Sequence, residues 1–164
     1  MDAQIEIRPI EPGDNVAIAA IIRSVLEEFG ANKPGTVYFD PETDHLYELF
    51  SNTPGSIYRV ATFQGKLLGG AGIFPTPALP DGTCELVKMY LLPEARGKGV
   101  GKALMEEAFS QAKNMGYTMI YIETMPELTR AIGLYEKLGF EYLKGPMGNS
   151  GHCGCDIWML KKLT

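Results

Sequence analysis

A glycine-rich segment in front of a helix is the first feature of this sequence that could do chemistry. Residues 96–102 read RGKGVGK, and a helical pattern of apolar residues follows them directly. Glycine keeps Cβ atoms away and permits positive φ, so the backbone can approach a ligand closely. Backbone N–H groups at the positive end of a helix dipole attract anions, and Lys98 and Lys102 add positive charge. The segment therefore predicts a phosphate or pyrophosphate site.

Three phosphate-binding patterns compete for this segment. A P-loop requires Gly, four residues and Gly-Lys-Ser/Thr, but its first glycine would fall on Arg96 and its last position on Ala103. A dinucleotide loop, Gly-x-Gly-x-x-Gly, would have Lys102 at its third glycine. The pattern Arg/Gln-x-x-Gly-x-Gly is satisfied in full by Arg96, Gly99 and Gly101.

At this point the chain resembles the GNAT superfamily of acyl-CoA-dependent N-acetyltransferases. The resemblance rests on KMYLLPEARGKGVG before the helix and on AIGLYEKLGF further along. It covers nearly the whole chain and is strongest from Glu85 to Phe140. It implies a single domain over residues 1–164 that takes acetyl-CoA as acyl donor, needs no metal, and acetylates a primary amine by direct attack in a ternary complex. The acceptor stays open between a small-molecule amine and a protein N-terminus or lysine.

The resemblance also implies which residues bind the donor. By motif position, the pyrophosphate is bound by Arg96, Gly97, Lys98, Gly99, Val100, Gly101 and Lys102. The preceding strand is implied to splay from its neighbour and to pair the pantetheine arm through backbone groups of Met89, Tyr90 and Leu91. Tyr135, the tyrosine of LYEKLGF, is implied as a donor contact and as the acid beside the thioester sulfur. Family members often carry Asn seven residues before this tyrosine, where this chain has Leu128.

Amide formation from a thioester requires that the attacking amine lose its positive charge, and a base contributes about 10²–10⁴-fold to such a step. Two glutamates compete for this role. By resemblance, Glu85 aligns with the base of the histone-acetyltransferase branch, and Glu123 with that of the ribosomal-protein alanine acetyltransferases. Burial in a cleft raises the pKa of a carboxyl group, as a base requires. The sequence leaves the choice open, with His152 as a remote third candidate.

The elements that must position these residues follow from the spacing of apolar and turn residues. Strands are predicted at 5–10, 56–63, 66–74, 84–92, 118–125, 140–145 and 155–163, and helices at 14–29, from 40 to about 50, from the glycine segment to about 115, and at 128–139. Successive strands without a helix between them pair antiparallel, whereas strand–helix–strand gives a parallel step. We therefore expect an α/β (α+β) fold, the GNAT acyltransferase fold, with a mixed, mostly antiparallel sheet of six to seven strands and about four helices.

Three further expectations concern local structure. The acceptor pocket should come from residues 14–50 and from the glycine-rich loop at 145–155. Glycines at 69–72 indicate that another group lies close to the sheet there. Asp14 is the expected N-cap of the first helix.

Composition bounds the remaining function classes. Hydrophobic residues make up 45% and charged residues 21%, and the net charge of −5 disfavours nucleic acid as a partner. The sequence contains no apolar run long enough for a membrane span and no signal-peptide pattern. In a chain without a secretion signal, an odd number of cysteines, here three, is typical of free thiols in a reducing cytoplasm. The HCGC run at 152–155 lacks a second ligand pair, which disfavours a metal site. A homodimer is possible, and the alternative function is a non-catalytic acyl-CoA-binding sensor or interaction module.

Overall fold

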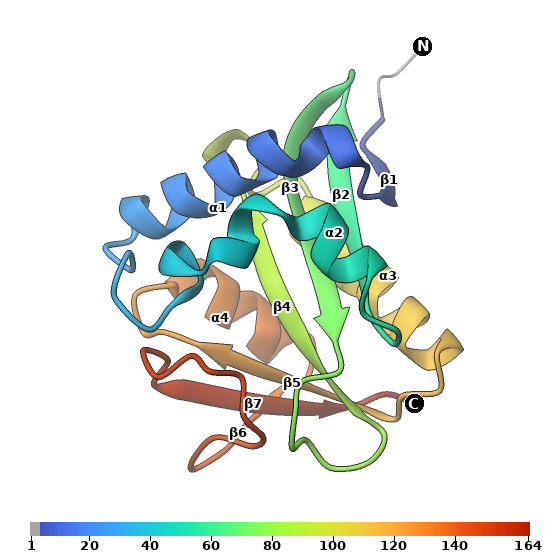
Figure 1. The fold of residues 1–164 in the computed structure, drawn as a ribbon, viewed down its shortest axis with the longest axis vertical. Helices are drawn as coiled ribbons and strands as arrows, with labels where there is room; N and C mark the ends of the chain where they lie inside the picture. The colour runs from blue at the N-terminus through green and yellow to red at the C-terminus, as the bar shows by residue number, and fades with distance from the viewer. Residues whose placement is uncertain (1–3) are drawn as a thin grey trace.

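The computed structural model describes residues 4–164, so the first three residues of the predicted domain 1–164 lie outside the described part. The chain forms one seven-stranded sheet in the order β1-β2-β3-β4-β5-β7-β6 (Figure 1). The strands are β1 (Glu6–Pro9), β2 (Ile57–Phe63), β3 (Lys66–Phe74), β4 (Thr83–Leu91), β5 (Met119–Thr124), β6 (Glu141–Tyr142) and β7 (Ile157–Lys162). The helices are α1 (Asn15–Glu28), α2 (Leu46–Ser51), α3 (Val100–Asn114) and α4 (Thr129–Lys137).

The sheet confirms the predicted fold class. All neighbouring strands pair antiparallel except β4 and β5, which are parallel. The β2–β3 hairpin turns at Gln64 and Gly65, whose φ values of 50° and 80° are those that a two-residue turn requires. The predicted single helix after Asp40 is wrong in detail: a 3₁₀ turn at Pro41–Asp44 precedes α2, because His45 between them leaves the helical region of φ and ψ.

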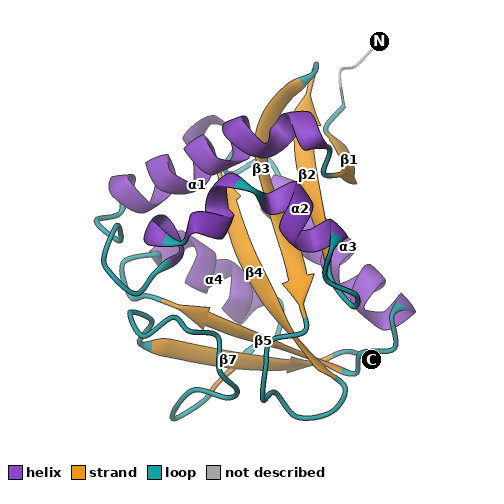
Figure 2. Cartoon of the chain, in the orientation of Figure 1, coloured by secondary structure: helices purple, strands orange, loops and turns teal. Residues whose placement is uncertain are grey.

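The sheet is covered on both faces. Helices α1 and α2 lie on one face and α3 and α4 on the other (Figure 2). The first pair packs into a cluster that includes Ile18 and Leu26, and the second pair into a cluster that includes Leu104 and Ala108. Side chains on both faces of the central strands are therefore buried, so a polar group on these strands needs a partner or a cavity.

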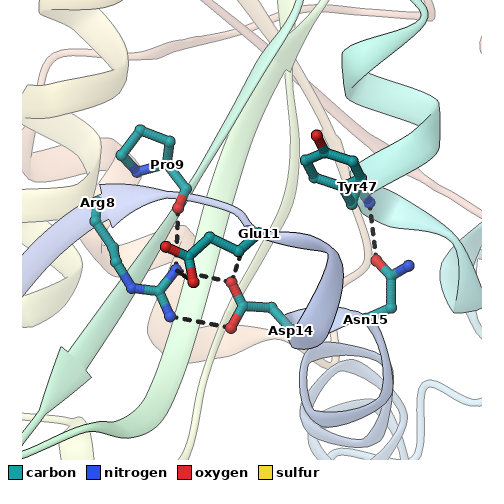
Figure 3. Close-up of polar contacts among 6 residues, drawn as sticks. All are labelled: Arg8, Pro9, Glu11, Asp14, Asn15 and Tyr47. Atoms are coloured by element: carbon teal, nitrogen blue, oxygen red, sulfur yellow. Dashed lines mark hydrogen bonds and ion pairs between the residues drawn. The ribbon is translucent and has the colours of Figure 1, made fainter.

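Asp14 stands at the N-cap of α1 as predicted, but its side chain does not cap the helix. Its carboxylate accepts two hydrogen bonds from the Arg8 guanidinium, at 2.8 and 3.0 Å, and one from the backbone N–H of Glu11 at 2.8 Å (Figure 3). The bond from Arg8 lowers the pKa of Asp14. Asn15 follows, and its side-chain oxygen accepts a hydrogen bond from the backbone N–H of Tyr47 at 2.9 Å. Asp14 thus joins β1 to α1, and Asn15 joins α1 to α2.

The glycines of β3 make room for a tyrosine of the chain itself. A Cβ atom added to Gly70 or Gly72 would lie 2.5 or 2.6 Å from ring atoms of Tyr58 on the neighbouring strand. The buried Tyr58 hydroxyl donates a hydrogen bond of 2.7 Å to the carbonyl of Lys88 on β4. The close approach predicted at 69–72 is therefore intramolecular, and it supports the part of β4 that borders the site.

Candidate active site

Strands β4 and β5 separate in the middle of the sheet. They pair only where residues 83–85 face residues 119–121, while β4 remains paired with β3 as far as Leu91. A cleft of about 560 Å³ opens at the separation. Its walls are the second half of β4, the glycine segment before α3, the end of β5, and α4.

The glycine segment at 97–102 presents unengaged backbone amides to this cleft. Gly97 and Gly99 adopt φ values of 73° and 79°, which would strain a residue that has a Cβ atom. Helix α3 begins directly afterwards at Val100. Among residues 4–164, no N–H from 97 to 102 donates to another group of the chain. Gly101 serves packing as well, because an added Cβ would lie 3.2 Å from Leu134. Free amides at a helix N-terminus form an anion-binding cradle.

Arg96, predicted to bind the donor, directs its side chain to α1. Its guanidinium donates to the carboxylate of Glu28 at 2.5 and 2.9 Å and to the carbonyl of Leu91 at 3.0 Å. It also lies 5.1 Å from the centre of the Phe29 ring. Arg96 therefore fixes the end of α1 against the end of β4, and the Leu91 carbonyl predicted to face a ligand is already engaged.

Tyr135 on α4 lines the cleft, as do Met89 and Tyr90 on β4. Tyr135 is 4% exposed, and its ring packs 5.7 Å from that of Phe140. Burial raises its pKa, so the hydroxyl is protonated at neutral pH and can donate a hydrogen bond into the cleft. Leu128 precedes α4 and lines the cleft with an apolar side chain.

Glu85 is the buried carboxyl of the site. It is 4% exposed, and its Oε1 accepts a hydrogen bond of 2.6 Å from the hydroxyl of Thr76. The pKa of Glu85 is raised to about 7: burial is the largest cause, the hydrogen bond from Thr76 opposes it, the nearby charge of Glu123 adds to it, and the charge of Lys88 opposes it. A carboxyl with this pKa is divided between its two protonation states near neutrality, which suits proton transfer.

Glu123 lines the same cleft but is held on both oxygens. Its Oε2 accepts a hydrogen bond of 2.8 Å from the hydroxyl of Tyr121, and its Oε1 accepts one from the hydroxyl of Ser150. The Tyr121 hydroxyl in turn accepts a 3.0 Å bond from the backbone N–H of Met147. These contacts fasten the loop at 145–155 to β5.

A second cavity of about 250 Å³ adjoins the cleft. It is formed by segments from 40–49 and 74–77, β4, and the loop at 150–152, so it joins the two regions predicted to build the acceptor pocket. Its polar lining consists of Asp40, Glu42, Thr76, Glu85, Lys88, Ser150 and His152. His152 lies with Nε2 2.7 Å from Oδ2 of Asp40. Glu85, Lys88 and His152 border both spaces.

Sequence reasoning missed Thr76 and Lys88. Lys88 had a signal, because it is the one charged residue inside the apolar run LVKMYLL. Thr76 had none, because its contact with Glu85 depends on how the chain leaves β3.

Within residues 4–164, no three His, Cys, Asp or Glu side chains are grouped so that they could hold a metal ion. No helix in this part of the chain has the length and apolar character needed to cross a membrane. Cys84, Cys153 and Cys155 are free thiols.

Comparison with known proteins identifies the family to which the chain belongs. The model of the acetyltransferase (GNAT) family matches residues 21–140. An uncharacterised N-acetyltransferase of Escherichia coli, YjgM, is 45% identical over 152 residues, which cover 92% of this chain and 90% of the relative. A GNAT acetyltransferase structure from Staphylococcus aureus superposes with a TM-score of 0.86 at 18% identity, covering 98% of this chain and 100% of that one. The PaiA N-acetyltransferase of Thermoplasma acidophilum, solved with coenzyme A, gives 0.74 at 22% identity, covering 97% and 99%.

Proposed function

The chain belongs to the acetyltransferase (GNAT) family, as its motifs predicted, and on this premise we propose that it transfers an acetyl group from acetyl-CoA to a primary amine by direct attack in a ternary complex. One observation carries the proposal: Glu85 lies between the cleft that ends on the unengaged amides and the second cavity. A donor in the cleft and an acceptor in the cavity would meet beside this carboxyl group.

The donor is proposed to lie along the cleft. Its pyrophosphate would accept hydrogen bonds from the amides of residues 97–102, with Lys98 and Lys102 adding about 1 kcal/mol or less each at exposed positions. Its pantetheine arm would pair with backbone groups of Met89 and Tyr90 on the side of β4 that β5 leaves open. The coenzyme A in the solved relative from Thermoplasma acidophilum supports this class of donor.

We assign the base to Glu85 rather than Glu123. Glu85 has a pKa of about 7, and among residues 4–164 only one of its oxygens accepts a hydrogen bond. Both oxygens of Glu123 are engaged, by Tyr121 and Ser150, and their release would detach the loop. Glu123 is therefore proposed to position the loop that closes the second cavity.

The proton balance of the reaction needs two groups. The amine nitrogen bonds to the thioester carbon, and its proton passes to Glu85, directly or through one water. A backbone N–H on the open side of β4 stabilises the charge that develops on the carbonyl oxygen. The carbon–sulfur bond breaks, and Tyr135 supplies a proton to the departing thiolate. The tyrosinate then takes a proton from water as protonated Glu85 releases one, so both groups return to their starting states.

Thermal stability with acetyl-CoA, followed by thiol release with a panel of primary amines, tests this function. We expect stabilisation by the donor and amine-dependent release of coenzyme A. Stabilisation without release on any amine would support the sensor alternative, and no stabilisation would contradict both. We further propose a single domain over 1–164 and, from the free cysteines, a reducing compartment such as the cytoplasm.

A further inference from the structure

Strand β4 carries an irregularity in its pairing with β3. Tyr90 pairs with Gly70 and Val87 pairs with Gly72, so one residue of β3 faces both Lys88 and Met89. This two-against-one pairing is a β-bulge. Lys88 adopts a φ of 53° there, which is uncommon for a residue that has a Cβ atom.

The bulge determines where the Lys88 side chain points. In a regular strand, side chains alternate between the two faces, so Lys88 would lie opposite Glu85 and Val87. Instead all three line the second cavity. Glycine would adopt this backbone without strain, so the pairing of the surrounding strand holds Lys88 in this conformation. The bulge thereby brings the lysine side chain to the cavity that Glu85 also lines.

The Lys88 amine has no counter-ion of its own. Among the described residues it makes no hydrogen bond and no ion pair within 4.0 Å. Burial lowers its pKa, while the more distant charges of Asp40, Glu85 and Glu42 oppose that effect. Asp40 is already paired with His152, and Glu85 with Thr76. The cavity thus presents an unpaired amine and a carboxyl group three positions apart on one strand.

Resting on the proposed acetyl transfer, we propose that the acceptor is a small amine that also bears a carboxylate, an α-amino acid or close analogue, and that Lys88 binds this carboxylate while Glu85 faces the amine. Glu85 and Lys88 both line the cavity, so a molecule with an amine and a carboxylate can meet a group of opposite charge for each. A polyamine would instead place a second positive charge beside Lys88. The volume of about 250 Å³ falls below the ~300–1,000 Å³ of pockets for drug-sized ligands. Leu49, Phe74 and Val87 leave an apolar wall for a side chain.

The test compares matched acceptors. Thiol release from acetyl-CoA is measured with L-leucine, L-methionine and L-phenylalanine, each beside its amide and its decarboxylated amine. Lys88→Met keeps the length of the side chain and removes its charge, and Lys88→Gly removes the side chain and relieves the backbone. Because each variant is compared with the wild-type protein on the same compound, differences in amine pKa within the panel cancel.

We expect the wild type to prefer at least one amino acid over its amide and amine. Both variants should lower kcat/KM for that amino acid by about 10- to 100-fold, mainly through KM, because a hydrogen bond to a charged group is lost. The charge of Lys88 lowers the pKa of Glu85, so the variants are compared at about pH 8, where the base is largely deprotonated. There the decarboxylated amine should change by less than about threefold, and Lys88→Arg should retain part of the preference. Lys88 also borders the donor cleft, so thermal stabilisation by acetyl-CoA is measured on each variant, and a loss of it would place Lys88 on the donor side.

Two results would overturn the assignment while leaving acetyl transfer intact. One is turnover of amines and amides with no preference for a carboxylate. The other is an equal loss for all acceptors in both variants, which would place Lys88 on the donor side. Absence of thiol release with every compound would instead contradict the proposed function itself.

Discussion

Replacing Glu85 with glutamine separates the chemistry of this residue from its shape. Glutamine keeps a side-chain oxygen that can accept the 2.6 Å hydrogen bond from Thr76, but it cannot take a proton from an amine. If Glu85 is the base, Glu85→Gln lowers kcat/KM by about 10²–10⁴-fold. In the wild type, kcat/KM should rise as the pH passes through about 7, because the deprotonated carboxylate is the active form.

The same substitution should stabilise the fold above neutral pH. Burial raises the pKa of Glu85 from 4.5 to about 7, so the folded state binds more protons than the unfolded state between these values. The contribution of Glu85 is therefore fully present below pH 4.5 and is lost as the pH rises through about 7. At about 1.4 kcal/mol per pKa unit, a rise from 4.5 to about 7 corresponds to a loss of at most about 3.5 kcal/mol, and Glu85→Gln does not incur it.

Two assays examine these expectations together. Thiol release is followed from about pH 5.5 to 9, and urea unfolding is measured at about pH 5 and pH 8, on either side of the transition. The free energy of unfolding of the wild type should fall between the two pH values by more than that of Glu85→Gln. Glu123→Gln serves as the control: if Glu85 is the base, this variant should keep a rise in kcat/KM, moved to lower pH because the charge of Glu123 raises the pKa of Glu85.

An equal pH dependence of unfolding in the wild type and Glu85→Gln would show that Glu85 does not titrate near neutrality in the folded state. Retention of the kinetic rise in Glu85→Gln, with its loss in Glu123→Gln, would transfer the role of base to Glu123. Either result would refute the reasoning from burial.

Three further substitutions test other parts of the site. Thr76→Val removes a hydrogen bond that lowers the pKa of Glu85, so the rise in kcat/KM should move above pH 7, and an unmoved profile would contradict the contact. Tyr135→Phe should lower kcat roughly 10- to 50-fold with an unchanged Tm, because the hydroxyl is proposed to protonate the leaving thiolate; wild-type turnover would exclude this role. Gly70→Ala would place a Cβ atom 2.5 Å from the Tyr58 ring and should lower the free energy of unfolding in urea by about 1–3 kcal/mol. Gly13→Ala is the control and should be nearly neutral, because the added Cβ atom has no neighbour within 4 Å among the described residues beyond those adjacent in the chain. Equal losses of stability in the two variants would contradict the packing around Tyr58.

The order of elements could be read from the sequence because it depends on local signals. Apolar spacing defines α1 and α3, the pair Gln64 and Gly65 defines a hairpin, and Pro93 ends a strand before the glycine segment. The same signals place the glycine segment and Tyr135 on elements that flank the cleft. The bulge at Lys88 left no such signal, because an extra residue in a strand changes the hydrogen-bond register with the neighbouring strand and leaves the residue composition of the strand unchanged.

The choice between the two glutamates needed tertiary contacts. Glu85 is distinguished by its burial and its single bond from Thr76, and Glu123 by two bonds, one of them from the distant Ser150. The contact of Arg96 could not be predicted from the sequence either, because its partner Glu28 lies 68 residues away. Charged side chains find partners according to how elements pack, and a single sequence does not record that packing.

The separation of β4 from β5 also bears on self-association. Unpaired strand backbone at the rim of a sheet is a template onto which another polypeptide can add. In this chain the unpaired stretch of β4 lies in the interior of the sheet, with Val25 and Phe29 at the end of α1 and Leu134 on α4 as its neighbours. An intruding polypeptide would need space for side chains on alternate sides, whereas a thin linear molecule would not. The chain can thus keep an open strand edge without becoming a seed for aggregation.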